Sequence, residues 1–277
     1  MRRVWLGLLT VLGLARRGFF IPHRHADAVP PAGQRGRYDA IARRFDAAQT
    51  DFLAVIDAID AVAGDLRRIG GEAPPQPRWQ QDWFPGLDAA AAYALMRREK
   101  PARLVEVGSG HSTRFLARAV RDGGLSCAII CIDPAPRADI AALAVTAIRQ
   151  TLQQAGLAPF AALQAGDVLF IDSSHILMPG SDVDLLLNRV IPALPAGVWI
   201  HVHDIFLPAD YPVSWDWRGY NEQQGFAALL TGGGFAPVFA SAYARSALTE
   251  RLEQSVMKDI IVPAGAFEAS LWLRKLQ

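Results

Sequence analysis

The ten residues from Leu104 to Thr113 constrain the fold of this chain more than any other stretch. A short apolar run ends at Glu106 and Val107, and a Gly-Ser-Gly turn leads into the polar start of a helix. This order is typical of a buried parallel strand, a tight turn and a helix N-terminus. Glycines let backbone N–H groups approach a ligand, and the helix dipole favours an anion there. Glu106 adds a negative charge that suits a cationic amine, so the stretch predicts a site for an amino-acid group such as the methionine part of S-adenosylmethionine (SAM).

The composition is that of a globular protein with a large core. The chain has 277 residues, of which 51% are hydrophobic and 20% are charged. Its net charge of +1 gives no electrostatic reason to expect nucleic acid as a partner. Cys127 and Cys131 lie in one predicted strand, roughly 13 Å apart, which is too far for a disulfide. Two reduced thiols are consistent with a cytoplasmic protein.

An apolar run from Val4 to Ala15 lies between two pairs of arginines, at 2–3 and 16–17. A dozen residues are too few to span a bilayer, which takes about 20. The run resembles the core of a signal peptide, and residues 26–28 resemble a cleavage site, but the segment between them is long and basic. We therefore favour a helix over secretion, and expect residues 1–20 to dock on the protein or to make weak contact with a membrane surface.

Residues 37–69 have the pattern of one long helix. Apolar side chains recur at alternating steps of three and four from Tyr38 to Leu66, and two glycines follow at 70–71. This heptad seam fits a coiled coil that forms a homodimer or an arm that packs on the chain's own domain, and the alanines favour the second. Proline-rich linkers flank the helix, so residues 1–78 are predicted to be a helical extension and residues 79–277 a separate domain.

Apolar strands alternate with helical segments through the rest of the chain. The predicted strands cover residues 103–107, 127–132, 145–148, 168–171, 198–202, 235–241 and 269–273. This order predicts an α/β fold with an open, mostly parallel sheet and helices on both faces. Ligands bind such sheets outside the carboxyl ends of the strands. Glu106, Asp133, Asp172 and Asp204 all stand at strand ends, and Asp133 is placed to accept hydrogen bonds from two ribose hydroxyls.

The residues from Glu106 to Gly110, followed by Asp133, resemble motifs I and II of the class I SAM-dependent methyltransferases. Residues 170–175 (Phe-Ile-Asp-Ser-Ser-His) and 201–206 (His-Val-His-Asp-Ile-Phe) are similar to a bacterial branch of small-molecule O-methyltransferases. The resemblance covers about 79–273 and implies SAM as cofactor and a Rossmann-like sheet of seven strands, with one antiparallel edge strand. It implies cofactor contacts at Glu106, Gly108, Gly110 and Asp133, to which we add Ser109, His111 and Asp172. Adenine is expected near Arg149 and Gln150.

Methyl transfer requires that the acceptor be aligned with the methyl group and lose a proton. The resemblance implies that the fourth and fifth strands are neighbours, with tips about 5 Å apart. Asp172, His203 and Asp204 would then be able to hold one divalent cation. Related metal-dependent enzymes have asparagine where this chain has Ile205, which weakens that hypothesis. The alternative is catalysis without metal by His175 as base, beside Asp172 and Asp204, and both alternatives stay open.

The loop 210–220 is too aromatic for an idle connector and follows the fifth strand directly. We expect it to form a lid or wall, with Tyr211, Trp215 and Trp217 stacked on a planar or sugar acceptor. Trp83 is expected to close the same pocket from the N-terminal side. His201 is predicted to be a core residue. The predicted reaction is O-methylation of a small molecule or glycan precursor.

Two other functions stay open. A nicotinamide-dependent oxidoreductase has a similar layout, but the Gly-x-Gly-x-x-Gly fingerprint fails at Thr113. In addition, no tyrosine of the chain has a lysine four residues on, as a short-chain dehydrogenase requires. A catalytically silent, methyltransferase-like binding subunit would keep the same fold and lose only the need for Asp172 and His175.

Overall fold

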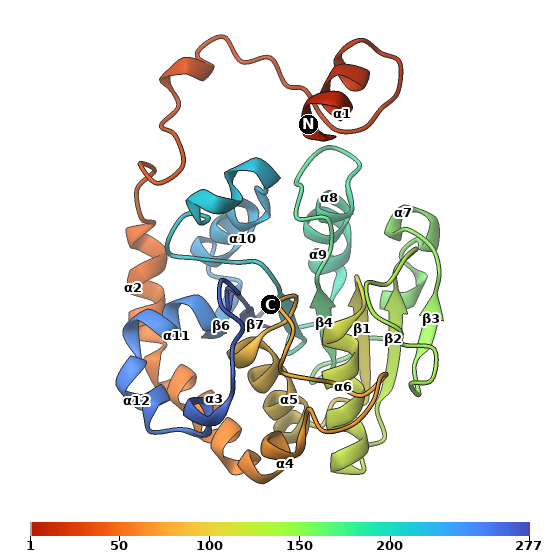
Figure 1. Cartoon of the computed structure of the whole chain (residues 1–277), viewed down its shortest axis with the longest axis vertical. Helices are drawn as coiled ribbons and strands as arrows, with labels where there is room; N and C mark the ends of the chain where they lie inside the picture. The colour runs from red at the N-terminus through yellow and green to blue at the C-terminus, as the bar shows by residue number, and fades with distance from the viewer. Residues whose placement is uncertain (1) are drawn as a thin grey trace. The chain divides into compact units, whose positions relative to one another are not determined.

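The computed structural model describes residues 2–277, and the chain divides into two compact units, Met1–Arg35 and Gly36–Gln277. The first unit contains helix α1 (Arg2–Val11) and a 3₁₀ turn, η1 (Ala26–Ala28). The second unit contains a seven-stranded sheet and the helices around it (Figure 1). No helix among the described residues is long and apolar enough to cross a membrane.

The sheet has the strand order β3-β2-β1-β4-β5-β7-β6. Its strands are β1 (Arg103–Val107), β2 (Ala128–Ile132), β3 (Thr146–Ile148), β4 (Val168–Ile171), β5 (Trp199–Val202), β6 (Phe235–Ala240) and β7 (Leu271–Lys275). Neighbours are parallel from β3 to β5, whereas β7 is antiparallel to both β5 and β6. The predicted seven-stranded, mostly parallel sheet is confirmed. The antiparallel strand, however, lies between β5 and β6 and is not an edge strand.

The connections between strands place helices on both faces of the sheet. The chain passes from β1 to β2 through α6 (His111–Gly123), and from β4 to β5 through α8 (Asp182–Leu185), a π-turn and α9 (Ile191–Ala193). These two crossovers step in opposite directions along the sheet, so right-handed connections put them on opposite faces. The strand order reverses between β1 and β4, and open α/β sheets bind ligands at the carboxyl ends beside such a switch point.

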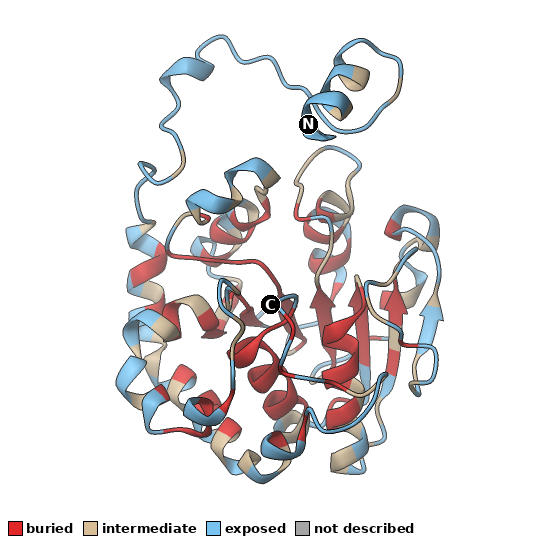
Figure 2. Cartoon of the chain, viewed as in Figure 1, coloured by how far each residue is buried: buried red, intermediate tan, exposed pale blue. Residues whose placement is uncertain are grey.

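The other helices complete the two outer layers. They are α5 (Gly86–Glu99), α7 (Leu152–Ala155), α10 (Glu222–Thr231), α11 (Ser241–Ala247) and α12 (Thr249–Glu253). Helix α5 packs beside α6, and its residues from Gly86 to Met96 are all buried. Figure 2 shows the burial concentrated in the strands and in the helix faces turned towards them. Cys127 and Cys131 are free thiols, as predicted.

Residues 37–69 form three short helices, and the prediction of one continuous helix is wrong. They are α2 (Asp39–Ala47), α3 (Gln49–Ala61) and α4 (Ala63–Arg68). Their apolar seam is buried or half-buried along its length, and Phe45 and Phe52 pack on Tyr243. The seam therefore packs on the chain's own domain, in the same compact unit as the sheet, whereas the predicted boundary lay at residue 78. A homodimer through 37–69 stays a prediction.

Candidate active site

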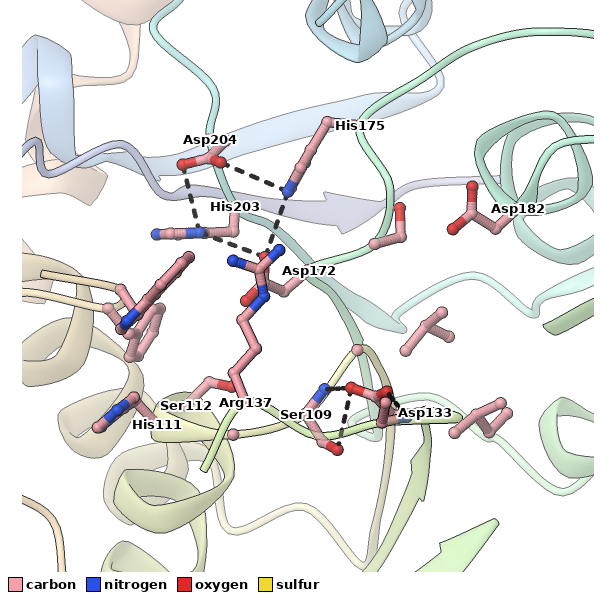
Figure 3. Close-up of a pocket in the computed structure, with 18 of the residues that line it drawn as sticks. Ser109, His111, Ser112, Asp133, Arg137, Asp172, His175, Asp182, His203 and Asp204 are labelled. Atoms are coloured by element: carbon pink, nitrogen blue, oxygen red, sulfur yellow. Dashed lines mark hydrogen bonds and ion pairs between the residues drawn. The ribbon is translucent and has the colours of Figure 1, made fainter. Parts of the chain in front are cut away.

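A cavity of about 350 Å³ lies at the carboxyl ends of the parallel strands (Figure 3). Its walls are the glycine turn after β1, the ends of β2 and β3, the loops after β4 and β5, and the aromatic loop. The predicted site residues that line it are Trp83, Gly108, Ser109, Gly110, His111, Asp133, Asp172, His175, His203, Asp204 and Trp215. Most of the predicted site residues are thus brought to one place.

Gly108 occupies a position that no other residue fits. Its φ is +81°, and a Cβ atom there would lie 1.7 Å from the backbone oxygen of Asp172. Its N–H donates a hydrogen bond to the carbonyl oxygen of Ile132 at 2.9 Å. The absence of a side chain at Gly108 therefore lets the turn after β1 touch the loop after β4 at the floor of the cavity.

Asp133 stands at the end of β2, where the sequence predicts contacts with ribose. Its Oδ2 accepts a hydrogen bond from the Ser109 N–H, and its Oδ1 accepts one from the Ala135 N–H, both at 2.7 Å. Oδ2 also accepts a hydrogen bond from the Ser109 hydroxyl at 3.4 Å, so Oδ1 is the oxygen that keeps a further lone pair for a ligand. Beyond β3 the cavity is lined by residues 151–153, and not by the residues 149–150 that were predicted to lie near adenine.

Glu106 does not line the cavity, and the prediction that it faces an amine of the ligand is wrong. Its fully buried carboxylate accepts hydrogen bonds from Ser112 and Thr113, both at 2.6 Å, and from the Cys131 thiol at 3.3 Å. Burial raises the pKa of Glu106 to about 7, although the three donors oppose this shift. Glu106 thus braces the first turn of α6 from beneath.

His111 begins α6 and presents a neutral imidazole to the cavity. Burial, reinforced by Arg114 and Arg78, lowers the pKa of His111 to about 4. Its Nδ1 atom is buried and has no hydrogen-bond partner within residues 2–277. A buried polar atom without a partner is costly, so this nitrogen is available to a ligand in the cavity.

Two histidines and two aspartates alternate around a square in the cavity wall (Figure 3). His175 Nε2 lies 3.4 Å from Oδ1 of Asp172 and 3.4 Å from Oδ2 of Asp204. His203 Nδ1 lies 3.5 Å from Oδ1 of Asp172 and 3.4 Å from Oδ1 of Asp204. We call these four residues the carboxylate–histidine square. It joins the tips of β4 and β5, which are parallel neighbours as the resemblance implied.

Each histidine of the square has its other ring nitrogen against a buried carboxylate. Glu222 Oε2 lies 2.9 Å from Nδ1 of His175, and Asp88 Oδ2 lies 3.3 Å from Nε2 of His203. Both carboxylates are fully buried. Sequence reasoning missed them, because each stands in the first turn of a helix, where an acidic residue is common.

Backbone strain accompanies the square. His175 and Asp204 have φ values of +61° and +57°, in the left-handed region that non-glycine residues seldom adopt. The surrounding backbone holds them: Asn221 N–H donates to the His175 carbonyl at 3.1 Å, and Ile205 N–H donates to the Ala269 carbonyl at 2.7 Å. Strain of this kind gathers at functional sites, where it fixes the direction of a side chain.

The square keeps its histidines charged. Burial disfavours the imidazolium form, but Asp204, Asp172 and Glu222 together raise the pKa of His175 well above its ordinary value. Burial opposes the charge of His203 as well, and Asp204 and Asp172 raise the pKa of that histidine in the same way. In return, the two histidines lower the pKa of Asp172 against the effect of burial. At neutral pH each histidine of the square is therefore protonated on both ring nitrogens.

The square does not fit the predicted metal site. Among residues 2–277, no group of three or more His, Cys, Asp or Glu side chains is arranged to hold a metal ion. The hypothesis of a divalent cation on Asp172, His203 and Asp204 is therefore not supported by the donor set.

Aromatic residues close two sides of the cavity. Arg137 lies 4.2 Å from the ring centre of Trp83, and Arg218 lies 3.9 Å from that of Trp215. Tyr220, the last residue of the predicted loop, also lines the cavity, and its ring centre is 4.6 Å from that of His175. The aromatic loop thus contributes a wall directly beside the square.

Two predicted pocket residues, Tyr211 and Trp217, lie outside the cavity. Tyr211 is buried against Phe206, and Trp217 is 61% exposed on the outside, so the prediction that they line the pocket is wrong. For Trp217 the reason is the 3₁₀ turn η4 (Val213–Arg218), in which residues two apart, such as Trp215 and Trp217, point in different directions. His201 is buried, with its ring 3.6 Å from that of Phe170, and is the core residue that was predicted.

Comparison with known proteins gives one family. Residues 105–205 match the family described as a methyltransferase domain. The matched segment begins in β1 and ends just after β5, so it contains the glycine turn, Asp133 and the whole carboxylate–histidine square. No curated protein matches this chain.

Solved structures of similar fold include three proteins that bind SAM or SAH. The methyltransferase PaMTH1 of Podospora anserina, bound to SAH, is 16% identical with a TM-score of 0.43, over 94% of this chain and 100% of that chain. An O-methyltransferase from Bacillus cereus in complex with SAH is 11% identical with a TM-score of 0.41, over 80% and 90%. The O-methyltransferase TomG from Streptomyces achromogenes, in complex with SAM, is 13% identical with a TM-score of 0.42, over 80% and 90%. Likeness this weak says nothing about the acceptor of the present chain.

The family match and the architecture coincide in one part of the molecule. The matched residues supply the five parallel strands, and the cavity at their carboxyl ends contains the motifs that the sequence singled out. Residues 105–205 are thus a match to a methyltransferase domain, and they lie in a Rossmann-like sheet of seven strands.

Proposed function

We propose that this protein transfers the methyl group of SAM to an oxygen of a small molecule or glycan precursor, in the cytoplasm. The observation that carries the proposal is the placement of His175. Its Nε2 faces the cavity between Asp172 and Asp204, and its Nδ1 lies 2.9 Å from the buried carboxylate of Glu222. Oxygen acceptors need a base to remove a proton, and this arrangement supplies one.

The residues around Gly108 fit SAM. Gly108 lets the turn after β1 lie against the Asp172 backbone, Asp133 Oδ1 has a lone pair for a ribose hydroxyl, and His111 offers a nitrogen without a partner in residues 2–277. The carboxylate oxygens of Asp172 and Asp204 stand at this end of the cavity, within reach of a sulfonium cation. Bound SAM supplies a methyl group, and the electron pair of its C–S bond remains on sulfur as the new O–C bond forms.

His175 receives the proton of the acceptor hydroxyl at Nε2. Glu222 accepts the Nδ1–H hydrogen bond, which fixes the tautomer and aims Nε2 into the cavity. The raised pKa makes His175 a strong base, but also fills Nε2 with a proton at neutral pH. A cation bound nearby lowers the pKa of an imidazole. We therefore infer that the arrival of SAM releases the proton from His175 and prepares the base.

The acceptor is expected to stack between the aromatic walls. Tyr220 and Trp215 line the cavity beside the square, and Trp83 lines it as well. Arg218 donates one hydrogen bond to the Tyr220 hydroxyl at 3.1 Å, while its buried Nε has no partner within residues 2–277. A substrate with a planar or sugar ring and an oxygen atom at its rim would accept a hydrogen bond from that nitrogen.

The test is a search for methylated products. The purified protein is incubated with SAM and a cell extract, and products that gain one methylene are detected by mass spectrometry. We expect such a product with the wild-type chain and with His23→Ala, an exposed histidine, and at least a hundredfold less with His175→Ala. A metal chelator should leave the rate unchanged. A rate that depends on the metal, or on neither His175 nor Asp172, would overturn the proposed base, and absence of any product would favour a silent binding subunit.

A further inference from the structure

Helix α1 exposes a row of apolar side chains that its own unit leaves uncovered. The helix has no buried residue, and Val4, Trp5, Leu8, Val11 and Leu12 are between 49% and 67% exposed. Their spacing places them on one side of a helix. We call these five residues the apolar face.

The opposite side of the helix is covered by the chain that follows it. The Thr10 hydroxyl donates to the Leu6 carbonyl and accepts from the Arg17 N–H, both at 3.0 Å. The N–H groups of Leu14 and Ala15 both donate to the Leu9 carbonyl. The returning turn therefore fixes which side is outward, and the apolar face is the side left open to a partner.

Positive charge surrounds the apolar face. Residues 2–26 contain five arginines and no acidic residue, and two arginines stand at each end of the apolar run, at 2–3 and 16–17. Next to the second pair, Phe19, Phe20 and Ile21 are all more than 45% exposed, and Arg16 lies 5.4 Å from the ring centre of Phe19. Apolar, aromatic and cationic groups are thus interleaved over one short segment.

We propose that residues 2–21 bind the surface of a membrane that contains anionic lipids. The apolar face would enter the boundary between headgroups and acyl chains, where Trp and Phe rings are stable, and the arginines would lie among phosphates. A helix of ten residues is about 15 Å long, half the thickness of the hydrocarbon core, so it would lie in the surface and not cross it. A groove on another protein would match the apolar face alone, whereas the arginines at both ends and the exposed rings match a bilayer surface. This inference does not depend on the proposed methyl transfer.

The experiment is flotation of the full chain with lipid vesicles. Vesicles of phosphatidylcholine mixed with phosphatidylglycerol should carry the protein upward, and vesicles of phosphatidylcholine alone should carry much less. Each arginine near an anionic surface strengthens binding roughly fivefold, so Arg16→Gln with Arg17→Gln should weaken binding to the anionic vesicles about 25-fold. Added salt should weaken it as well.

The apolar face is tested by Trp5→Asp combined with Leu8→Asp, which should reduce vesicle binding at least tenfold. Ile261→Asp is the matched control, because Ile261 is 63% exposed and lies in the other unit, and it should bind as the wild type does. Methyl transfer to a water-soluble acceptor should be the same in all of these variants. Failure of the wild type to float with anionic vesicles, or equal flotation of Trp5→Asp/Leu8→Asp, would overturn the proposal. Self-association without lipid that the double variant abolishes would overturn it too, because the occupant would then be a second copy.

Discussion

The Nδ1 atom of His175 lies 2.9 Å from Oε2 of Glu222, a carboxylate with no exposure to solvent. The second oxygen of that carboxylate, Oε1, is buried and has no hydrogen-bond partner within residues 2–277. Burial raises the pKa of Glu222, and His175 opposes that rise. Glu222 is thus a buried carboxylate that faces one imidazole. It raises the proton affinity of His175 and fixes the direction of the other ring nitrogen.

The pH dependence of turnover tests this pair. His175 must lose its proton to act as a base, and its pKa is raised in the SAM-free enzyme, so wild-type kcat/KM for SAM should rise with pH and reach its midpoint well above 6.5. Glu222→Gln removes one of the charges that raise the pKa, so the midpoint should move to lower pH, and kcat should fall about ten- to hundredfold as the ring loses its orientation. Glu250→Gln, at an exposed position, should match the wild type. Coinciding midpoints for Glu222→Gln and the wild type would refute the role of the pair.

A methyl group at Gly108 should be far more damaging than the same group at Gly265. Both residues have a φ of +81°, but a Cβ at Gly265 meets nothing within 4 Å, whereas one at Gly108 meets the Asp172 backbone. Gly265→Ala should therefore cost about 1 kcal/mol of unfolding free energy, from backbone strain alone. Gly108→Ala should cost about 3 kcal/mol or more and should abolish SAM binding. Urea unfolding followed by circular dichroism measures the unfolding free energy of both variants. Equal losses of unfolding free energy would show that the turn at Gly108 does not touch the loop at Asp172.

Asp88→Asn should destabilise the fold as well as the site. The Asp88 carboxylate accepts hydrogen bonds from the N–H groups of Ala269 and Ser270, both at 2.9 Å, and also faces His203. An asparagine has one acceptor oxygen, so one buried N–H would lose its partner, at a cost of about 1–3 kcal/mol. Asp39→Asn, in the exposed first turn of α2, should change the unfolding free energy by less than about 0.5 kcal/mol. Equal unfolding free energies for Asp88→Asn and Asp39→Asn would show that Asp88 does not hold the two backbone N–H groups.

The buried Glu106 should make the protein less stable as the pH rises. Its pKa is about 7 in the folded state and 4.5 in the ordinary state, so the folded chain holds this proton over a range in which the unfolded chain has lost it. Stability should therefore fall as pH increases from about 4.5 to about 7, by an amount on the order of 3 kcal/mol from this residue.

Glu106→Gln isolates that contribution, because an amide does not titrate. The difference in unfolding free energy between wild type and Glu106→Gln should shift in favour of the variant as the pH is raised from about 4.5 to about 7. The exposed Glu253→Gln serves as control and should leave the pH dependence unaltered. A difference that is constant from about pH 5 to about pH 8 would mean that Glu106 is not held in the environment described.

The sequence predicts the strands of this fold and the identity of their tips, because apolar runs that end in an acidic residue are a strong signal. It does not predict the direction of Glu106. Strands that are buried on both faces show no alternation of polar and apolar residues, so the side of the sheet to which a tip residue turns is left undetermined. The period of the 37–69 segment predicts which residues are buried, but not the breaks at Ala48 and Val62 that let it follow the domain surface.

The two buried carboxylates behind the square, Glu222 and Asp88, could not be predicted from the sequence for another reason. Glu222 is 47 residues from His175, and Asp88 is 115 residues from His203. Nothing local distinguishes them from ordinary acidic residues at helix starts, and only the packing of α5 and α10 against the tips of β4 and β5 gives them their role. The aromatic loop shows the same limit, since its 3₁₀ turn decides that Trp215 faces the cavity and Trp217 does not.

Calorimetric titration of the full chain with SAM is the most direct test of the central claim, that the cavity between Gly108, Asp133 and the carboxylate–histidine square is a SAM site. We predict saturable binding of SAM, no binding of NAD, and at least tenfold weaker binding of SAM by Asp133→Ala. Asp27→Ala, which removes an exposed carboxylate in the other unit, should bind SAM as the wild type does. Binding of NAD without binding of SAM, or equal SAM affinity in Asp133→Ala and the wild type, would contradict the account.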